Sequence, residues 1–513
     1  MKRKNIFFVF LIIFLCVLYF LFGEKNTNES ILKLGVINIK KEGLNPLFVR
    51  NSENIFIVNL LFNSLFDTKL NINEKDSIAK GLKVSEDKRT VYVYLKRNVY
   101  FHNGKLLDSQ DVKWTYSCLI DKSKDTYFSK YSLIKKIKVK NKFCIEFDFK
   151  DKVYFPYYFF SYSILPFIKE TSLKNSSFTF SPIGTGKYKL LKINEKGDLW
   201  LVKNDNYFGN KKWLFDKVFF KSYSDKKAQW AGFLKGEIDV FYNLEHSQYE
   251  LIKNEDWCCF YKTYGLSCEV LKMNPNSMFL RDLKVRNAID YAIDRNMIVD
   301  KVYQGFADGR NILFYDKDKI KSIRRNVGYD IEKAKELLKQ AGFSDKDNDG
   351  VLEKNGKRLN LRLLVNVHYK NSVKIAKIIK LNLWKIGIDV TVIPINTVSY
   401  NKNEYDMIIK NNTVLNFIPW IQHSMDCLDG VPEKEKIIDY CKDAMVFKKM
   451  NEDEIREIVK TILGQKIELY LTVPYRIFAV NKKFSNIGID IANEYFSLYM
   501  VEPLKVKGGG NEI

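Results

Sequence analysis

The chain has 513 residues, more than one compact core usually organises, so at least two lobes are expected. Hydrophobic residues make up 46% of the chain and charged residues 28%, a composition that excludes an intrinsically disordered protein. The net charge of +23 is spread evenly, without a zinc-finger, basic-zipper or RNA-binding signature, and this argues against nucleic acid as a partner.

The amino terminus carries the pattern of an export signal. The basic cluster Met1–Lys4 precedes an unbroken apolar run, Ile6–Phe22, which ends at Gly23. Its 17 residues are at the short limit of the ~17–25 residues that span a bilayer. Because positive residues stay on the cytoplasmic side, the rest of the chain is expected outside the cytoplasmic membrane.

Three interpretations of this segment stay open. Residues 1–23 are interpreted first as an uncleaved anchor that tethers the protein to the membrane, and second as a cleaved signal peptide, with residues 24–30 as a linker. Lipidation at Cys16 is the third interpretation. It is the least favoured, because bulky Leu15 stands where a bacterial lipoprotein signal has a small residue.

The first half of the chain is rich in predicted strands. Ile31–Val36 and Val91–Leu95 are short β-branched or aromatic runs of strand length. Turns and short helices separate such runs. One helix is predicted to begin at Asp108 or Ser109, since either side chain can cap it.

Helical periodicity appears after Asn274. Five apolar residues recur at helical spacing and predict one apolar face: Val285, Ala288, Ile289, Ala292 and Ile293. Asp330 is predicted to cap a second helix, and Gly342 to end it in the left-handed conformation.

A strand–helix–strand unit follows. The alternating runs Leu359–Val365 and Ile388–Val392 predict two strands. Ser372 is predicted to cap the intervening helix, which Gly387 ends. A unit of this length indicates a parallel pair of strands, so the second half is predicted to form an α/β lobe.

The cysteines beyond residue 16 indicate no disulfide scaffold. They are odd in number and lack metal-ligand spacing: Cys118, Cys144, Cys258, Cys259, Cys268, Cys427 and Cys441. Buried free thiols are expected for most of them, with oxidation in the stretch from Cys258 to Cys268 as the alternative for an exported chain.

A series of short motifs runs along the first part of the chain. Tyr100–Val112 holds His-Asn-Gly before a helix cap and Asp-Val, and Pro182–Tyr188 holds Gly-Thr-Gly-Lys-Tyr. Asn204–Phe208 and Leu234–Asp239 contain Asn-Asp-Asn-Tyr-Phe and Gly-Glu-Ile-Asp. Asp282–Val299 holds Val-Arg-Asn-Ala and Tyr-Ala-Ile-Asp-Arg.

Three further motifs complete the series: Tyr329–Phe343, Asp347–Glu353 and Lys385–Val390. Read in order, the set resembles the family 5 extracellular solute-binding proteins, which serve oligopeptide, dipeptide and nickel importers of the ABC type. The matches span roughly residues 44 to 480. One departure is the Lys in Gly-Thr-Gly-Lys-Tyr, where the family usually has proline.

The resemblance implies an α/β, two-lobed periplasmic-binding-protein fold with an extra subdomain in the first lobe. Lobe I would comprise residues 31–270, lobe II residues 271–477, and residues 478–513 would return to lobe I. The two crossings between lobes would lie near Cys268–Pro275 and Pro474–Lys482. Hinge closure of such lobes around a solute is what a membrane permease can distinguish from the empty protein.

The resemblance also implies two ligand-contacting segments. The first follows Leu44–Pro46 and comprises Arg50, Asn51 and Ser52. The second follows the predicted strand Tyr405–Ile409, where peptide binders of the family have Gly-Trp and then an aspartate that pairs with the ligand's amino group. This chain instead has Lys410, Asn411 and Asn412. Loss of that carboxylate would favour an anionic or capped ligand, and Arg50 could pair with a carboxylate in bidentate fashion.

Residues that could suggest catalysis have simpler interpretations. His102 is interpreted as ordering a turn before the helix cap, and Gly184–Gly186 as a turn, because it lacks the Lys-Ser/Thr of a phosphate loop. Asp345–Gly350 begins like a calcium loop, but position twelve is Gly356, so a polar turn is preferred over a weak structural cation site. No nucleophile set or zinc spacing is present, so no enzyme activity, metal or cofactor is predicted.

Three functional hypotheses follow. The first is a peptide receptor that delivers its solute to an ABC permease from the outer face of the cytoplasmic membrane or the periplasm, most simply as a monomer. The second keeps the fold but binds a metal chelate or another non-peptide solute. The third is a sensor or surface interaction protein that works without a permease.

Overall fold

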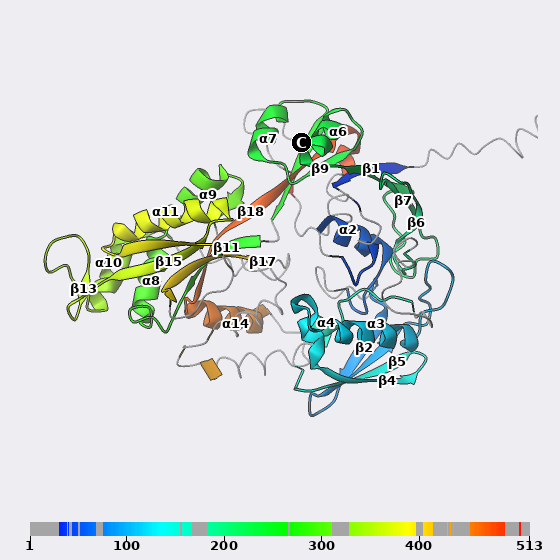
Figure 1. The fold of residues 1–513 in the computed structure, drawn as a ribbon, viewed down its shortest axis with the longest axis horizontal. Helices are drawn as coiled ribbons and strands as arrows, with labels where there is room; N and C mark the ends of the chain where they lie inside the picture. Colours follow the sequence, from blue (N-terminus) through cyan, green and yellow to red (C-terminus); the bar gives the residue numbers. More distant parts are fainter. Residues whose placement is uncertain are drawn as a thin grey trace, which may run out of the picture.

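The structure is a computed structural model of the chain. It describes residues 30–37, 39, 44–49, 52–67, 75–153, 156–166, 182–264, 267–309, 328–396, 404–413, 428, 431, 434–435, 452–487 and 502–503. These residues form two lobes, which lie on the right and on the left of Figure 1.

Lobe I combines two sheets and the helices that cover them. Its elements up to the first crossing are β1 (Ile31–Ile37), α2 (Ser52–Leu61), β2 (Ala79–Val84), β3 (Thr90–Leu95), α3 (Ser109–Asp121), the 3₁₀ helix η2 (Thr126–Leu133), β4 (Ile134–Asn141), β5 (Cys144–Phe149), α4 (Pro156–Phe159), β6 (Tyr188–Ile193), β7 (Leu199–Lys203), β8 (Lys217–Tyr223), α6 (Lys226–Leu234), β9 (Val240–Tyr242), α7 (His246–Ile252) and β10 (Cys258–Tyr264).

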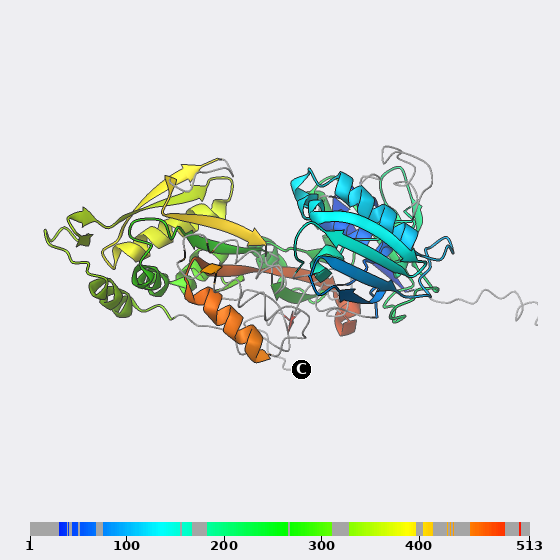
Figure 2. The same cartoon turned by 90° about the horizontal axis from the view of Figure 1, so that it is seen from below.

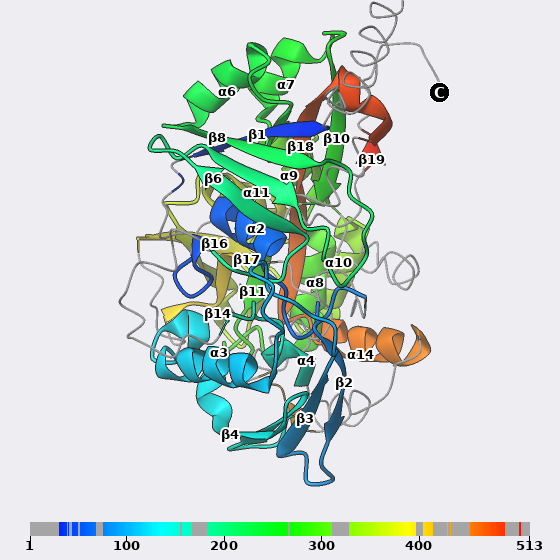
Figure 3. The same cartoon turned by 90° about the vertical axis from the view of Figure 1, so that its right-hand side faces the viewer.

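The two sheets of lobe I lie at opposite ends of it. Strands β2, β3, β5 and β4 form a separate antiparallel sheet at the lower end in Figure 3, next to α3. Strands β1, β8, β7 and β6 belong to a larger sheet, with α6 and α7 at the upper end. One hydrophobic cluster includes side chains from both sheets, among them Leu32, Val93 and Phe220, so the small sheet is packed into the same core.

Lobe II is an α/β layer. Its elements are β11 (Ser267–Met273), α8 (Leu283–Ala292), α9 (Arg295–Tyr303), β12 (Ala307–Asp308), α10 (Ile331–Gln340), β13 (Glu353–Lys354), β14 (Lys357–Arg358), β15 (Asn360–Asn366), α11 (Lys370–Trp384), β16 (Asp389–Ile395), β17 (Met407–Thr413) and α14 (Glu452–Gly464). Strand β15 pairs in parallel with both β16 and β17, and β11 pairs antiparallel with β17.

A long strand, β18 (Glu468–Asn481), connects the lobes. It runs from the left-hand lobe to the right-hand lobe in Figures 1 and 2, and the 3₁₀ helix η4 (Lys482–Ile487) and β19 (Glu502–Pro503) follow it. Its first part pairs with β11 and its last part with β10 and β9. The chain also passes between lobes from β10 to β11. The described residues on the two sides of this second passage are strands, and the predicted boundary at 477/478 falls inside β18.

Local sequence signals account for several of these elements. Asp108 is the residue that caps α3: its carboxylate accepts from Gln110 N at 2.9 Å, while Asp111 completes a capping box. Asp330 caps α10 by accepting from Lys333 N at 2.9 Å, and Gly342 has a φ of +84° just after that helix. These predictions are confirmed.

Two helix predictions are corrected. Ser372 does not cap α11: the helix begins two residues earlier, and the Ser372 hydroxyl bonds elsewhere, as described below. The apolar face that was predicted to continue to Ile293 ends with α8 at Ala292. Asp294 then caps α9 by accepting from Met297 N at 2.9 Å, so this segment forms two helices.

Some predictions concern segments beyond the described residues. The predicted anchor, residues 1–23, lies outside them, and within the described ranges no helix is both long and apolar enough to cross a membrane. The five described cysteines are free thiols: Cys118, Cys144, Cys258, Cys259 and Cys268.

Candidate functional site

The inner edge of the lobe II sheet is the part of the fold best placed to receive a solute. The parallel strands β15 and β17 both end there, at Asn366 and Thr413, and β11 begins there, at Ser267. Open α/β sheets bind ligands at the carboxyl ends of their parallel strands. This edge also lies where β18 leaves lobe II, so it adjoins both connections between the lobes.

A buried carboxylate lies at this edge. Glu269 on β11 is 2% exposed, and burial raises the pKa of its carboxyl group. Three neutral donors bind it: the Ser372 hydroxyl at 3.1 Å, the Tyr303 hydroxyl at 3.3 Å and Asn411 Nδ2 at 3.4 Å. No cationic side chain in the described part of the chain pairs with it.

The helix dipole adds a partial positive charge at this point. Ser372 is the third residue of α11, a helix of 15 residues whose amino-terminal turn lies against the Glu269 carboxylate. Such a terminus carries about half a positive charge. The dipole and the three neutral donors favour the anion, but they do not compensate a full buried charge.

The predicted segment at the end of β17 contributes to this cluster in part. Asn411 lies opposite Glu269 in the ladder and is exposed. Lys410 and Asn412 lie opposite Val270 and Cys268, so their side chains point to the other face of the sheet. The Asn412 amide nitrogen is buried there and lacks a hydrogen-bond partner in the described ranges.

The other predicted segment is described only at its end. Arg50 and Asn51 lie outside the described residues. Ser52 is the first residue of α2, and the structure does not describe its side chain. The roles predicted for these residues stay predictions.

Sequence reasoning did not identify Glu269. One signal was present, because Leu271 and Met273 share its face of β11 and belong to the lobe II core. A glutamate at the next inward position breaks this apolar alternation. A charged residue at an inward position is a candidate for function, because burial of an unpaired charge is costly.

His102 has a structural role. Its Nδ1 accepts from Gly184 N at 3.3 Å, and its Nε2 lies 3.2 Å from Gly186 O. Burial lowers the pKa of the imidazole to about 4, so the ring is neutral at neutral pH. The histidine side chain therefore holds the Gly-Thr-Gly turn, and not the turn before the cap of α3 that was predicted from the sequence.

The glycines of this turn are required by close backbone contact. A Cβ at Gly184 would lie 1.9 Å from Leu61 O, and a Cβ at Gly186 would lie 2.2 Å from Leu60 O. Both carbonyls belong to the last turn of α2. The turn thus fixes the end of α2, the helix whose start is the predicted contact segment.

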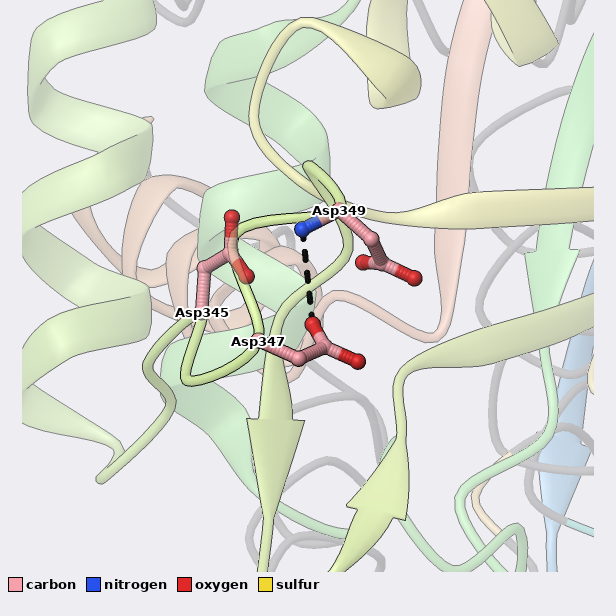
Figure 4. A group of neighbouring side chains, drawn as sticks. All are labelled: Asp345, Asp347 and Asp349. Carbon is pink, nitrogen blue, oxygen red and sulfur yellow. Dashed lines mark hydrogen bonds between the residues drawn. The ribbon is translucent and has the colours of Figure 1, made fainter.

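The acidic loop of lobe II is shown in Figure 4. Asp345, Asp347 and Asp349 place carboxylate oxygens within 4.8 Å of one another, the one such group of three in the described ranges. Each carboxylate accepts from a backbone N–H of the loop, and Arg358 pairs with Asp349 and, at 3.9 Å, with Asp347. These contacts are those of a polar turn.

Comparisons with known proteins agree on one group. The sequence model described as "Bacterial extracellular solute-binding proteins, family 5 Middle" matches residues 75–419. The chain is 28% identical to the oligopeptide-binding protein AppA of Bacillus subtilis over 418 residues, 76% of each chain. It is 27% identical to the nickel-binding periplasmic protein of Escherichia coli over 335 residues, 62% of each chain.

Solved structures share the fold. NikA from Brucella suis, in complex with Fe(III)-EDTA, matches with a TM-score of 0.67 and 22% identity, over 88% of this chain and 95% of that one. At this identity the likeness supports the architecture alone. The sequence relatives are solute-binding proteins rather than enzymes.

Proposed function

The chain belongs to the bacterial extracellular solute-binding proteins of family 5, and we propose that its solute is a peptide, captured by closure of the two lobes. Proteins of this family bind small solutes or peptides and deliver them to ABC permeases. The proposal extends this to a protein that acts outside the cytoplasmic membrane as a monomer, with residues 1–23 as its tether.

The polar cluster around Glu269 is the observation that carries the proposal. It combines a carboxylate, two hydroxyl groups and an exposed amide at the edge of lobe II that adjoins both connecting strands. Polar groups of this kind can fix the orientation of a bound molecule. Closure of lobe I towards this edge would remove the bound solute from water, and a permease could recognise the closed form.

A peptide is favoured over a metal ion that the protein would ligate with its own side chains. The relative with 76% coverage is named for oligopeptide binding. Of the described histidines, His102 bonds the Gly-Thr-Gly turn, His246 lies near Glu250 and His368 is exposed, and none of them belongs to a described group of side chains that could hold a metal ion. Imidazole ligation of a metal thus has no support in the described ranges.

A metal chelate is the second candidate. It is supported by the name of one relative, a nickel-binding protein, and by the Fe(III)-EDTA complex of a similar structure. A chelate brings its own metal ligands, so its receptor needs charged and polar groups rather than clustered histidines. The predicted residues Arg50 and Lys410 would suit an anionic chelate of this kind.

Native mass spectrometry of the full-length protein, released from a mild detergent without refolding, tests the assignment. A series of adducts at peptide masses, lost on mild denaturation, is the expected result. One discrete adduct that contains a metal would instead support the chelate. If the protein carries no adduct and a random peptide library does not raise its melting temperature, the peptide proposal is wrong.

A further inference from the structure

A second charged side chain without an ion-pair partner among the described residues lies on β18, the strand that connects the lobes. Arg476 on β18 is half-buried, and no carboxylate of the described residues lies within ion-pair distance of it. Burial lowers the pKa of its guanidinium group, and this effect outweighs the opposing effect of the Tyr242 hydroxyl. A partly buried guanidinium without a counter-ion loses part of its hydration without compensation.

A buried hydroxyl group accompanies the carboxylate. Thr472 lies opposite Glu269 in the β11–β18 ladder and is 1% exposed. Its Oγ1 lies near the Tyr303 hydroxyl but has no hydrogen bond of ordinary geometry within the described ranges. A buried hydroxyl without a partner is uncommon, because the loss of hydrogen bonds to water is then uncompensated. The group is therefore placed to bind the same partner as Glu269.

The two charges lie on one face of β18. Thr472 and Arg476 are four residues apart in the strand, so their side chains share a face, and Glu269 lies beside Thr472. At ~3.3 Å per residue, the strand separates the two positions by about 13 Å. Between them, Val473 and Pro474 pair with β12 at the point where β18 leaves lobe II. The negative charge is thus on lobe II and the positive charge on the lobe I side of the crossing.

We propose that the solute is a zwitterion, with a cationic group bound by Glu269 and an anionic group bound by Arg476. This inference rests on the proposed capture of a solute between the lobes, and it specifies the charge pattern of that solute. An extended peptide spans ~3.3–3.6 Å per residue, so a separation of about 13 Å corresponds to roughly four residues with free termini. A short peptide of this kind would pair with both charges and would link the two lobes.

In this proposal Glu269 takes the place of the aspartate that, by resemblance, peptide binders of the family have after the strand that corresponds to β17. In this chain the carboxylate comes from β11, the neighbouring strand, and lies opposite Asn411. An ammonium group could reach Oε1 of Glu269 if the Asn411 amide turned aside, because that contact is the longest of the three, at 3.4 Å. Asn411 is exposed and therefore free to change its rotamer.

Calorimetry with four forms of tetra-alanine tests the inference on the full-length wild-type protein. The four forms have free termini, an acetylated amino end, an amidated carboxyl end, or both modifications. Loss of either charge is expected to weaken binding about ten- to hundredfold, the usual effect of removing a charge-assisted hydrogen bond. The doubly modified peptide should bind most weakly.

Two variants test which residue binds each charged end of the peptide. Glu269→Gln should weaken binding of the free peptide at least tenfold and abolish the effect of acetylation. Arg476→Gln should likewise weaken binding of the free peptide at least tenfold, and it should abolish the effect of amidation. The matched controls are Glu237→Gln and Arg358→Gln, whose carboxylate and guanidinium groups have partners away from this cluster, and they should bind like the wild type.

The possible results distinguish a failure of charge recognition from a failure of peptide capture. If all four peptides bind the wild type equally, charge recognition is wrong while peptide capture stands. If none of the four binds, the peptide assignment fails, and the inference fails with it. If Glu269→Gln remains folded and still discriminates against acetylation, Glu269 is not the residue that binds the ammonium group.

Discussion

The Ser372 hydroxyl donates a hydrogen bond to Oε2 of Glu269 over 3.1 Å, although 103 residues separate the two in the sequence. The contact joins the first turn of α11 to the inner end of β11. It also gives Ser372 a partner in the candidate site rather than in its own helix. The Glu269 carboxylate has only neutral hydrogen-bond donors among the described residues, and this affects how stability and affinity depend on pH.

Glu269→Gln is expected to stabilise the ligand-free protein at neutral pH by roughly 1 kcal/mol, because it removes a buried charge and keeps a hydrogen-bonding side chain. The folded-state pKa of Glu269 is raised, so the folded state holds the proton more tightly than the unfolded state. Stability of the wild type therefore falls as pH rises from the ordinary glutamate value through the raised one. The advantage of the variant should be present at pH 7.5 and absent at pH 4, as measured by urea unfolding. An equal stability difference between variant and wild type at pH 7.5 and pH 4 would contradict this prediction.

Affinity for free tetra-alanine is expected to rise with pH between 4.5 and 7. The cationic end requires the ionised form of Glu269, whose pKa is raised in the free protein, so binding at lower pH must release a proton. Tyr303 and the neighbouring Cys268 do not titrate in this range, because burial raises the pKa of each further above neutrality. Calorimetry in two buffers with different ionisation enthalpies measures the proton release. The acetylated peptide should show none.

His102→Gln should remove an acid-sensitive component of stability. Burial holds the pKa of this histidine at about 4, below its ordinary value of 6.5, so the unfolded state binds the proton first. Stability of the wild type should fall as pH decreases from 6.5 to 4, by about 3 kcal/mol. The variant should be less stable at pH 7 but should lack this slope in denaturant titrations. Peptide affinity should be unchanged. An unaltered pH slope would mean that another group titrates.

Gly184→Ala should lose about 3 kcal/mol of unfolding free energy or more, since its Cβ would lie 1.9 Å from Leu61 O and the backbone would have to move. Gly81→Ala is the matched control. It places a Cβ where nothing lies within 4 Å, and it should change stability by less than about 1 kcal/mol. Thermal unfolding of both variants checks the difference. Similar melting temperatures would show that the turn can relax.

The elements that were predicted correctly depend on neighbours in the sequence. The cap at Asp330 and the left-handed Gly342 act within one helix, and the alternation in Leu359–Val365 needs only the two faces of a strand. The parallel pairing of β15 with β16 followed from the length of the connection between them. Such signals are local and survive packing.

The candidate site depends on contacts that no local pattern contains. Glu269 binds side chains that are 34, 103 and 142 residues further along the chain. Ser372 looked like a cap because serine commonly caps helices, but packing of α11 against the sheet placed it inside the first turn. The motif resemblance indicated strand β17, yet it gave no sign of the buried carboxylate on the neighbouring strand β11.

The strand shared by both lobes limits how such proteins can be recombined. Removal of β18 from lobe I would leave the edges of β9 and β10 unpaired, and its removal from lobe II would do the same to β11. Neither lobe is then a self-contained module that could be transferred to another receptor. An exchange of solute preference between relatives would have to occur by substitutions within the inherited whole.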